Sequence, residues 1–127
     1  MSQTSPEPIH YSSEAIRWCY GENTPSNQDN FFQITKWWTS LHGKRIKMRS
    51  ITGTERYRVG ERWLWKPIQE DPIQEFEIQN PQIDNEFLSF DGSSIEEPIK
   101  VQCVDFDMGQ NQLIAEVNSA IKYVFTL

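Results

Sequence analysis

From position 44 onward the apolar residues of this chain recur with a period of two, and this alternation constrains the fold more than any other feature of the sequence. In the stretch KRIKMRSI (44–51), Ile46 and Met48 fall on one face of a strand and the basic residues between them fall on the other. The pattern returns in RYRVGERWLWKP (56–67). Alternation of this kind predicts β-strands that place one face in a core.

The segment between these two strands favours a hairpin. TGTE (52–55) is rich in turn formers, and Gly53 can take a positive φ, so we expect the chain to reverse there. We expect Gly60 to form a bulge within the second strand rather than a turn of its own.

Prolines and acidic residues dominate the next stretch, from position 66 to position 87. Pro67, Pro72 and Pro81 exclude a central strand across most of it, so EFEIQ (75–79) is expected to pair only briefly, at a sheet edge. The following residues, EFLSFDGSS (86–94), predict a short strand that enters an Asp-Gly turn.

The last third of the chain alternates most clearly. We expect strands before and after a turn that contains Gly109 and Asn111, and a final strand over AIKYVFTL (120–127). A helix through 112–124 also fits a 3.6-residue period and stays an alternative.

The N-terminal part predicts helices. Residues 1–11 are expected to be a flexible arm, and 12–127 a single compact domain. Residues 12–21 predict a short helix and 22–30 a loop. Over 30–43, four apolar residues share one helical face, with Asp29 or Asn30 as the cap, although the aromatic and β-branched content leaves a strand as the alternative.

These elements define the expected fold class. It is α+β and mostly β, with one or two short N-terminal helices followed by five to seven strands in an antiparallel, curled sheet or small partly open barrel. The chain of 127 residues shows no apolar run long enough for a membrane span and nothing that resembles a signal peptide. We therefore expect a cytoplasmic protein that does not bind membranes.

Two cysteines, Cys19 and Cys103, lie far apart in the sequence. In a cytosolic compartment we expect both to be reduced and buried as small apolar residues. Without a C-x-x-C motif or a cysteine and histidine cluster, we expect neither a metal site nor another cofactor.

Charge is unevenly distributed along the chain, whose net charge is −6. Residues 36–66 hold nine basic and two acidic residues, whereas residues 70–107 hold eleven acidic residues and one basic residue. Two interpretations remain open: the segments neutralise each other across a sheet, or they form two faces that each match a partner.

No recognised catalytic motif occurs in the sequence, so we expect a protein that is not an enzyme. His10 and His42 are expected to be solvated or to cap a helix. Asp105 and Asp107 are spaced to share a strand face, and a small-ligand barrel or enzyme with these carboxylates at its mouth is the weakest alternative.

The leading hypothesis is an accessory or inhibitory domain that binds another protein, and a nucleic-acid-processing complex is one candidate setting for it. Tryptophan and arginine are favoured at interface hot spots. Neighbouring Trp37 and Trp38 diverge by about 100° on a helix, so they do not fit one buried stripe together. The residues expected to bind the partner are Trp37, Trp38, Arg56, Arg58, Arg62, Glu70, Glu75 and Glu77.

The alternative is RNA or single-stranded DNA binding through the basic hairpin 44–66, in which cations contact phosphates and aromatic rings stack on bases. In a regular strand Tyr57 lies opposite the face of Arg56 and Arg58, so this interpretation depends on the expected bulge at Gly60. Its expected binding residues are Arg45, Lys47, Arg49, Tyr57, Trp63, Trp65 and Lys66.

Overall fold

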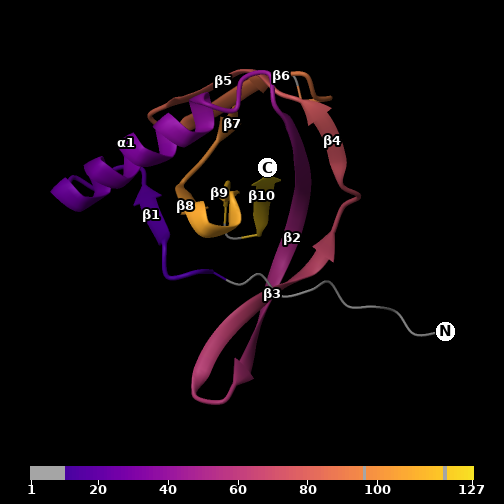
Figure 1. Ribbon diagram of the computed structural model, residues 1–127. Helices are drawn as coiled ribbons and strands as arrows, with labels where there is room; N and C mark the ends of the chain where they lie inside the picture. Colours follow the sequence, from indigo (N-terminus) through magenta and orange to yellow (C-terminus); the bar gives the residue numbers. More distant parts are fainter. Residues whose placement is uncertain (1–10, 96, 119) are drawn as a thin grey trace.

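The computed structural model describes residues 11–95, 97–118 and 120–127 (Figure 1). Within these ranges it leaves undescribed the side chains of Thr54, Val59, Arg62, Trp63, Leu64, Trp65 and Pro67. The predicted arm lies outside the described residues apart from Tyr11. In chain order the elements are β1 (Ala15–Cys19), α1 (Pro25–Thr39), β2 (Arg45–Val59), β3 (Arg62–Glu70), β4 (Gln74–Glu77), β5 (Gln79–Asp84), β6 (Phe87–Asp91), β7 (Ile99–Lys100), β8 (Cys103–Asp107), the 3-10 helix η1 (Met108–Gln110), β9 (Gln112–Glu116) and β10 (Ile121–Thr126).

Two antiparallel sheets organise these strands. The larger sheet has the order β1-β8-β9-β10-β2-β3, and β4 pairs with the first part of β2. The smaller sheet has the order β5-β6-β7, and it lies beside α1 (Figure 1). The expected class, mostly β with antiparallel sheets, is confirmed, but the described strands do not close into a barrel.

The prediction of a helix over 12–21 is wrong, because Ala15–Cys19 form β1. β1 pairs along its whole length with β8, from Ala15 opposite Asp107 to Cys19 opposite Cys103. Within β1, Trp18 is buried and Arg17 is exposed. Five residues are too few for the period to separate a strand from a helix, so the distant strand β8 decides the conformation.

The predicted second helix is confirmed as α1, but it begins at Pro25, inside the expected loop. Thr24 is its N-cap: the Thr24 hydroxyl accepts a hydrogen bond from the Asn27 N–H at 3.1 Å. Pro25 occupies the first turn, where its missing N–H costs no hydrogen bond. Among the described residues no helix is long and apolar enough to cross a membrane.

Trp38 joins the helix to both sheets. It is fully buried, and its ring packs edge-on against Phe90 of β6 and Phe125 of β10, with ring centroids 5.9 and 4.9 Å away. Its indole N–H donates to the carbonyl of Gln82 in β5 at 3.2 Å. A buried tryptophan with a satisfied N–H contributes a large apolar area to a core, and here it anchors α1 between the sheets.

The expected turn at 52–55 is wrong, because β2 is one strand from Arg45 to Val59 and keeps one pairing register with β3 from Ile51 to Val59. Gly53 does take a positive φ, of 74°, but within the strand. The chain reverses at Gly60 and Glu61, with Val59 opposite Arg62, so the bulge predicted at Gly60 is also wrong. Glycine at the first position of a two-residue turn supplies the positive φ that such hairpins need, here 63°.

The C-terminal third follows the predicted alternation. β8, β9 and β10 pair with one another in sequence order, which excludes the alternative helix over 112–124. β6 enters the expected turn, with Gly92 at a φ of 103°, and β4 is the short edge strand expected near 75–79. The described residues form ten strands in place of the predicted five to seven, because several are only two to five residues long.

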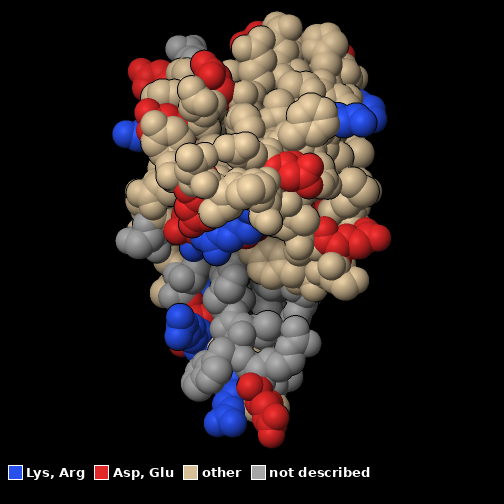
Figure 2. Space-filling view, turned by 90° about the vertical axis from the view of Figure 1, so that its left-hand side faces the viewer, with Lys and Arg blue, Asp and Glu red and all other residues tan. Residues whose placement is uncertain are grey.

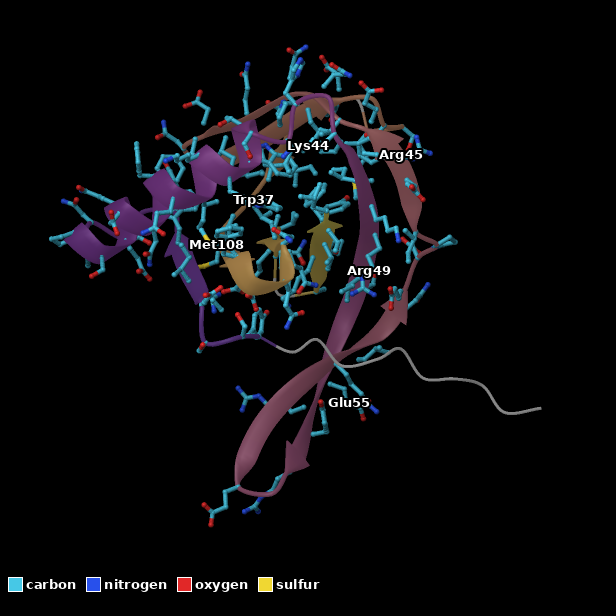
Figure 3. The ribbon with its side chains drawn as sticks, viewed as in Figure 1. Trp37, Lys44, Arg45, Arg49, Glu55 and Met108 are labelled. Carbon is cyan, nitrogen blue, oxygen red and sulfur yellow. A yellow bond between two sulfur atoms is a disulfide. The ribbon has the colours of Figure 1, made fainter. Side chains whose placement is uncertain are left out.

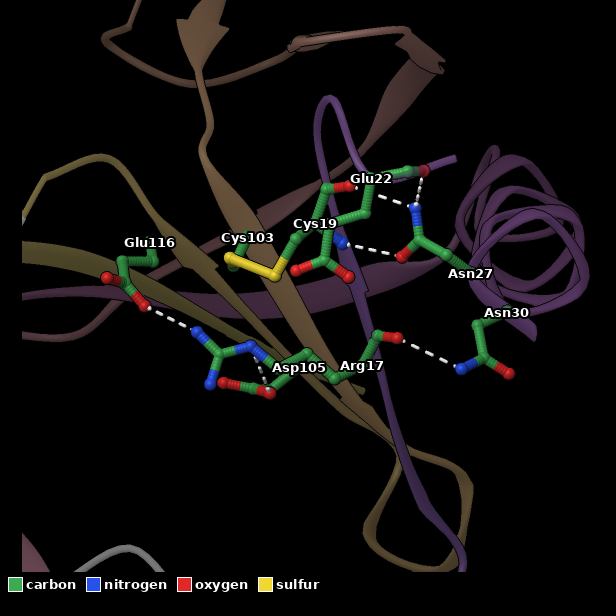
Figure 4. The surroundings of a disulfide bond; sticks show 8 residues. All are labelled: Arg17, Cys19, Glu22, Asn27, Asn30, Cys103, Asp105 and Glu116. Carbon is green, nitrogen blue, oxygen red and sulfur yellow. Dashed lines mark hydrogen bonds and ion pairs between the residues drawn. A yellow bond between two sulfur atoms is a disulfide. The ribbon is translucent and has the colours of Figure 1, made fainter. Parts of the chain in front are cut away.

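The two cysteines form a disulfide bond, so the expectation that both stay reduced and buried is wrong (Figure 4). Cys19 and Cys103 stand directly opposite each other on β1 and β8, with Cα atoms 4.1 Å apart, and both are half-buried. Buried Asn27 fixes the same strand end, since it accepts from the Cys19 N–H at 2.8 Å and donates to the Cys19 carbonyl at 2.9 Å. The disulfide links residues 84 positions apart, a separation that spacing in the sequence alone does not pair.

Replacing Cys19 with serine should lower the free energy of unfolding by about 2–4 kcal/mol, because the crosslink restricts a long loop of the unfolded chain. Urea denaturation of the oxidised parent and of Cys19→Ser measures the difference. The double variant Cys19→Ser/Cys103→Ser is the control, whose midpoint should not respond to a dithiol. This expectation is contradicted if thiol titration shows that the disulfide of the parent protein is reduced and the urea midpoint of unfolding is nevertheless unchanged.

Candidate functional site

The outer part of the β2–β3 hairpin projects from the rest of the molecule, and we call residues 54–67 the ribbon (Figure 1). β10 pairs with β2 only between Lys47 and Thr52, and β4 pairs with it only between Arg45 and Met48. Beyond Thr52, β3 is the one strand that pairs with β2 in the described chain. A two-stranded hairpin is marginally stable by itself in water, so the ribbon has little support beyond its own cross-strand pairing.

Gly53 marks the point where the sheet gives way to the ribbon. Its N–H donates to the carbonyl of Ala120 at 2.6 Å, which is the last link to the β10 side before the ribbon begins. An added Cβ would lie 3.2 Å from the side chain of Ile68, and the φ of 74° would be strained for any other residue. Glycine therefore allows β2 to continue past the body of the molecule.

The register settles which ribbon residues share a face. Arg56 stands opposite Trp65 and Arg58 opposite Trp63, and residues paired directly across a ladder belong to the same face. The positions of the two tryptophans are thus on the face of the arginines without any bulge, while Tyr57 is on the other face. The side chains of Trp63, Trp65 and Arg62 themselves lie outside the described part of the structure.

Charge changes along β2. In its first half, Arg45 pairs with Glu75 at 2.9 Å and Arg49 pairs with Glu70, so basic and acidic segments neutralise each other there. In the ribbon, Arg56 and Arg58 are exposed, and the Arg58 guanidinium donates to the carbonyl of Gly60 at 2.8 Å. The ion pairs support mutual neutralisation in the first half of β2, and a partner-binding face on the ribbon stays a prediction.

The remaining charged residues that we expected in a binding site are outside the ion pairs of Arg45 and Arg49. Lys66 is 3.9 Å from Glu55 across the ribbon, on the face of Tyr57. Lys47 is exposed, and Glu77 accepts a hydrogen bond from the side chain of Gln79 at 2.8 Å. Figure 2 shows basic and acidic side chains on the narrow projection as well as on the broader body of this face.

Trp37 and Trp38 separate as the helical period requires. Trp38 is in the core, whereas Trp37 is half-buried and packs on Phe106 with ring centroids 4.9 Å apart. Trp37 and the exposed Met108 face each other from α1 and η1 across a surface hollow of about 370 Å³ (Figure 3). Trp37 is accordingly the one of the pair that a partner can reach.

Asp105 and Asp107 are held by their own chain. Asp105 pairs with Arg17 at 3.7 Å, and burial raises the pKa of its carboxyl beyond what Arg17 offsets (Figure 4). Asp107 is 1% exposed and accepts hydrogen bonds from the backbone N–H and the hydroxyl of Ser12. Burial alone would raise the pKa of Asp107, but the hydrogen bonds from Ser12, together with those from the backbone of Gln110 and Gly109, outweigh it and hold that pKa below its usual range.

From the sequence we expected the two histidines to be solvated or to cap a helix, and we expected no metal site. His42 lies beyond the end of α1, and its Nδ1 accepts from the Asn80 N–H at 3.0 Å. His10 lies outside the described part of the chain. The described side chains bring together no group of three or more histidine, cysteine, aspartate or glutamate residues able to hold a metal ion.

The ribbon itself is the feature that the sequence interpretation missed. The signal was present: Gly60-Glu61 stands between two alternating stretches, and Gly-X at the centre is a known two-residue hairpin turn. TGTE (52–55) carried a competing turn signal in the same strand. The pairing of β2 with β3 shows that the chain uses the turn at Gly60-Glu61.

Comparison with known proteins identifies no relative: no protein-family description, curated protein or solved structure matches this chain. The fold and the ribbon are therefore the basis for any functional argument.

Asp107→Asn should lower the free energy of unfolding at pH 7 by about 1–3 kcal/mol, because it weakens two hydrogen bonds to a charged acceptor. Since the pKa of Asp107 is depressed in the folded state, its contribution is present above about pH 4 and is lost as the pH falls through the folded pKa. Urea unfolding at pH 7 and at about pH 2.5 measures both effects.

Asp84→Asn, at an exposed position of β5, is the matched control and should change stability little at either pH. The interpretation fails if Asp107→Asn and the parent lose stability in parallel on acidification.

Proposed function

We propose that this chain is a non-enzymatic accessory or inhibitory domain that binds another protein, and that the ribbon is its docking element. The observation that carries the proposal is the ribbon's pairing: residues 54–67 form a two-stranded projection with no third described strand beside it. An element with this much open backbone and little support of its own is suited to gain its partners from another molecule.

Charge supports the same assignment. The ribbon holds four of the twelve basic residues and two of the eighteen acidic residues, which leaves eight basic and sixteen acidic residues elsewhere. A net charge of +2 on the ribbon thus stands beside −8 on the remainder. Arg56 and Arg58 are exposed on it, and arginine is among the residues that most often dominate binding energy.

The contacts and burial of the residues that we expected to bind the partner change which of them we assign to the interface. Glu70 and Glu75 have arginine partners within the chain, and Trp38 is in the core, so we assign none of them to the interface. Arg56 and Arg58 carry the proposal, and Trp37 with its hollow beside Met108 is a second contact point. A cytoplasmic location stays a prediction, and the disulfide is the feature that argues against a reducing compartment.

RNA or single-stranded DNA binding is a second candidate, favoured by the register that places the positions of Trp63 and Trp65 on the face of Arg58 and Arg56. Arg45 and Arg49, which a basic groove would need, are paired with glutamates. Few cations then remain to release counterions, so the expected affinity is low and its dependence on salt concentration is shallow. Titration with a single-stranded oligonucleotide at two salt concentrations tests it.

The double variant Arg56→Glu/Arg58→Glu should reduce capture of the partner from native cell extract by about tenfold, because reversed charges on a docking arm oppose a complementary surface. Quantitative mass spectrometry after affinity capture measures the loss. Lys44→Glu is the matched control, since Lys44 is an exposed cation at the opposite end of β2 (Figure 3).

All three proteins should unfold at the same urea concentration, which separates docking from folding. Capture of the same proteins, in the same amounts, by the parent and by the double variant would refute the assignment, as would the absence of any captured protein.

A further inference from the structure

The edge of β2 that faces the β10 side is open along the ribbon. β10 stops opposite Thr52, and the N–H of Gly53 is taken by Ala120. From Thr54 to Val59 no described strand continues the line of β10. Backbone N–H and C=O groups are obligatory hydrogen-bonding groups, and such an edge is a template for another strand.

The turn fixes which backbone groups point to that edge. Val59 and Arg62 close a two-residue turn, and such a closing pair exchanges its backbone hydrogen bonds. Bonded and non-bonded pairs alternate along an antiparallel ladder, so counting back from Val59 directs the backbone groups of Thr54 and Arg56 toward the open edge. Pro67 stands opposite Thr54, and a residue without an N–H fits a non-bonded position.

The two edges of the ribbon differ. Pro67 removes a donor from the outer edge of β3, as prolines at protected sheet edges do. The edge of β2 between Gly53 and Val59 contains no proline. Its ribbon face carries Arg56 and Arg58 and, by register, no acidic residue, because Glu55 falls on the face of Tyr57.

We propose that the edge of β2 between Gly53 and Val59 binds an extended, acidic segment of a protein partner, which adds as an antiparallel strand in line with β10. This inference rests on the proposed function and specifies the chemistry of its partner. Main-chain hydrogen bonds to Thr54 and Arg56 provide the docking, and acidic side chains opposite Arg56 and Arg58 provide selectivity. Glutamate or aspartate at every second position of the partner meets this requirement.

The probe is a short acetylated and amidated peptide of alternating glutamate and valine, titrated into isotopically labelled protein and followed by amide shifts. In an added strand, the residues opposite Arg56 share its face and direct their N–H groups to β2. N-methylation of the glutamates should therefore weaken binding by about tenfold or more, because it removes these donors. N-methylation of the valines should change affinity by less than about threefold.

Two substitutions at one position separate backbone from charge. Arg56→Ala removes the guanidinium, and Arg56→Pro also removes the outward N–H while sparing the ladder to β3. Arg56→Pro should bind the peptide about tenfold more weakly than Arg56→Ala. Lys44→Glu, outside the ribbon, should bind as the parent does.

Equal binding of the two N-methylated peptides, or equal binding by Arg56→Pro and Arg56→Ala, overturns strand addition. Concentration-dependent self-association through the ribbon, or preference for an oligonucleotide over the peptide, overturns the choice of occupant. If the arginine double variant still loses its captured partner in these cases, the proposed function stands and only the mode of binding fails.

Discussion

β2 runs for fifteen residues, and each strand beside it is shorter, so the strands that flank β2 change along its length. β4 and β10 flank its first half, and β3 alone accompanies its second half. At roughly 3.4 Å per residue, β2 is far longer than the six-residue β10. The ribbon projects because of this difference in strand length. Away from the ribbon, Trp38 packs in the core where α1 and both sheets meet.

Elements with strong local patterns could be predicted from the sequence. The strands of the last third, the Asp-Gly turn and the apolar stripe of α1 each depend on neighbours within a few residues. β1 could not be predicted, since its five residues become a strand only against β8. The disulfide depends on the same long-range register, because Cys19 reaches Cys103 only when β1 pairs in this frame.

The candidate site was predicted in composition but not in geometry. The sequence indicated a basic, aromatic hairpin, yet two turn signals competed within it, and the register between β2 and β3 shows which one is used. The same is true of the charges. Arg45 meets Glu75 and Arg49 meets Glu70 across neighbouring strands, so counting charges along the chain overstates the basic surface that is available.

The return path of the chain after the ribbon explains why the arginines in the first half of β2 have glutamate partners. β3 leads back along β2 to Glu70, and β4 then places Glu75 beside Arg45. Arg58 lies six residues beyond Thr52, roughly 20 Å along an extended strand. That separation exceeds the Debye length of about 8 Å at physiological ionic strength, so the acidic body does little to offset the charge of the ribbon. The ribbon can therefore act as a cationic element in its own right on a chain whose net charge is −6.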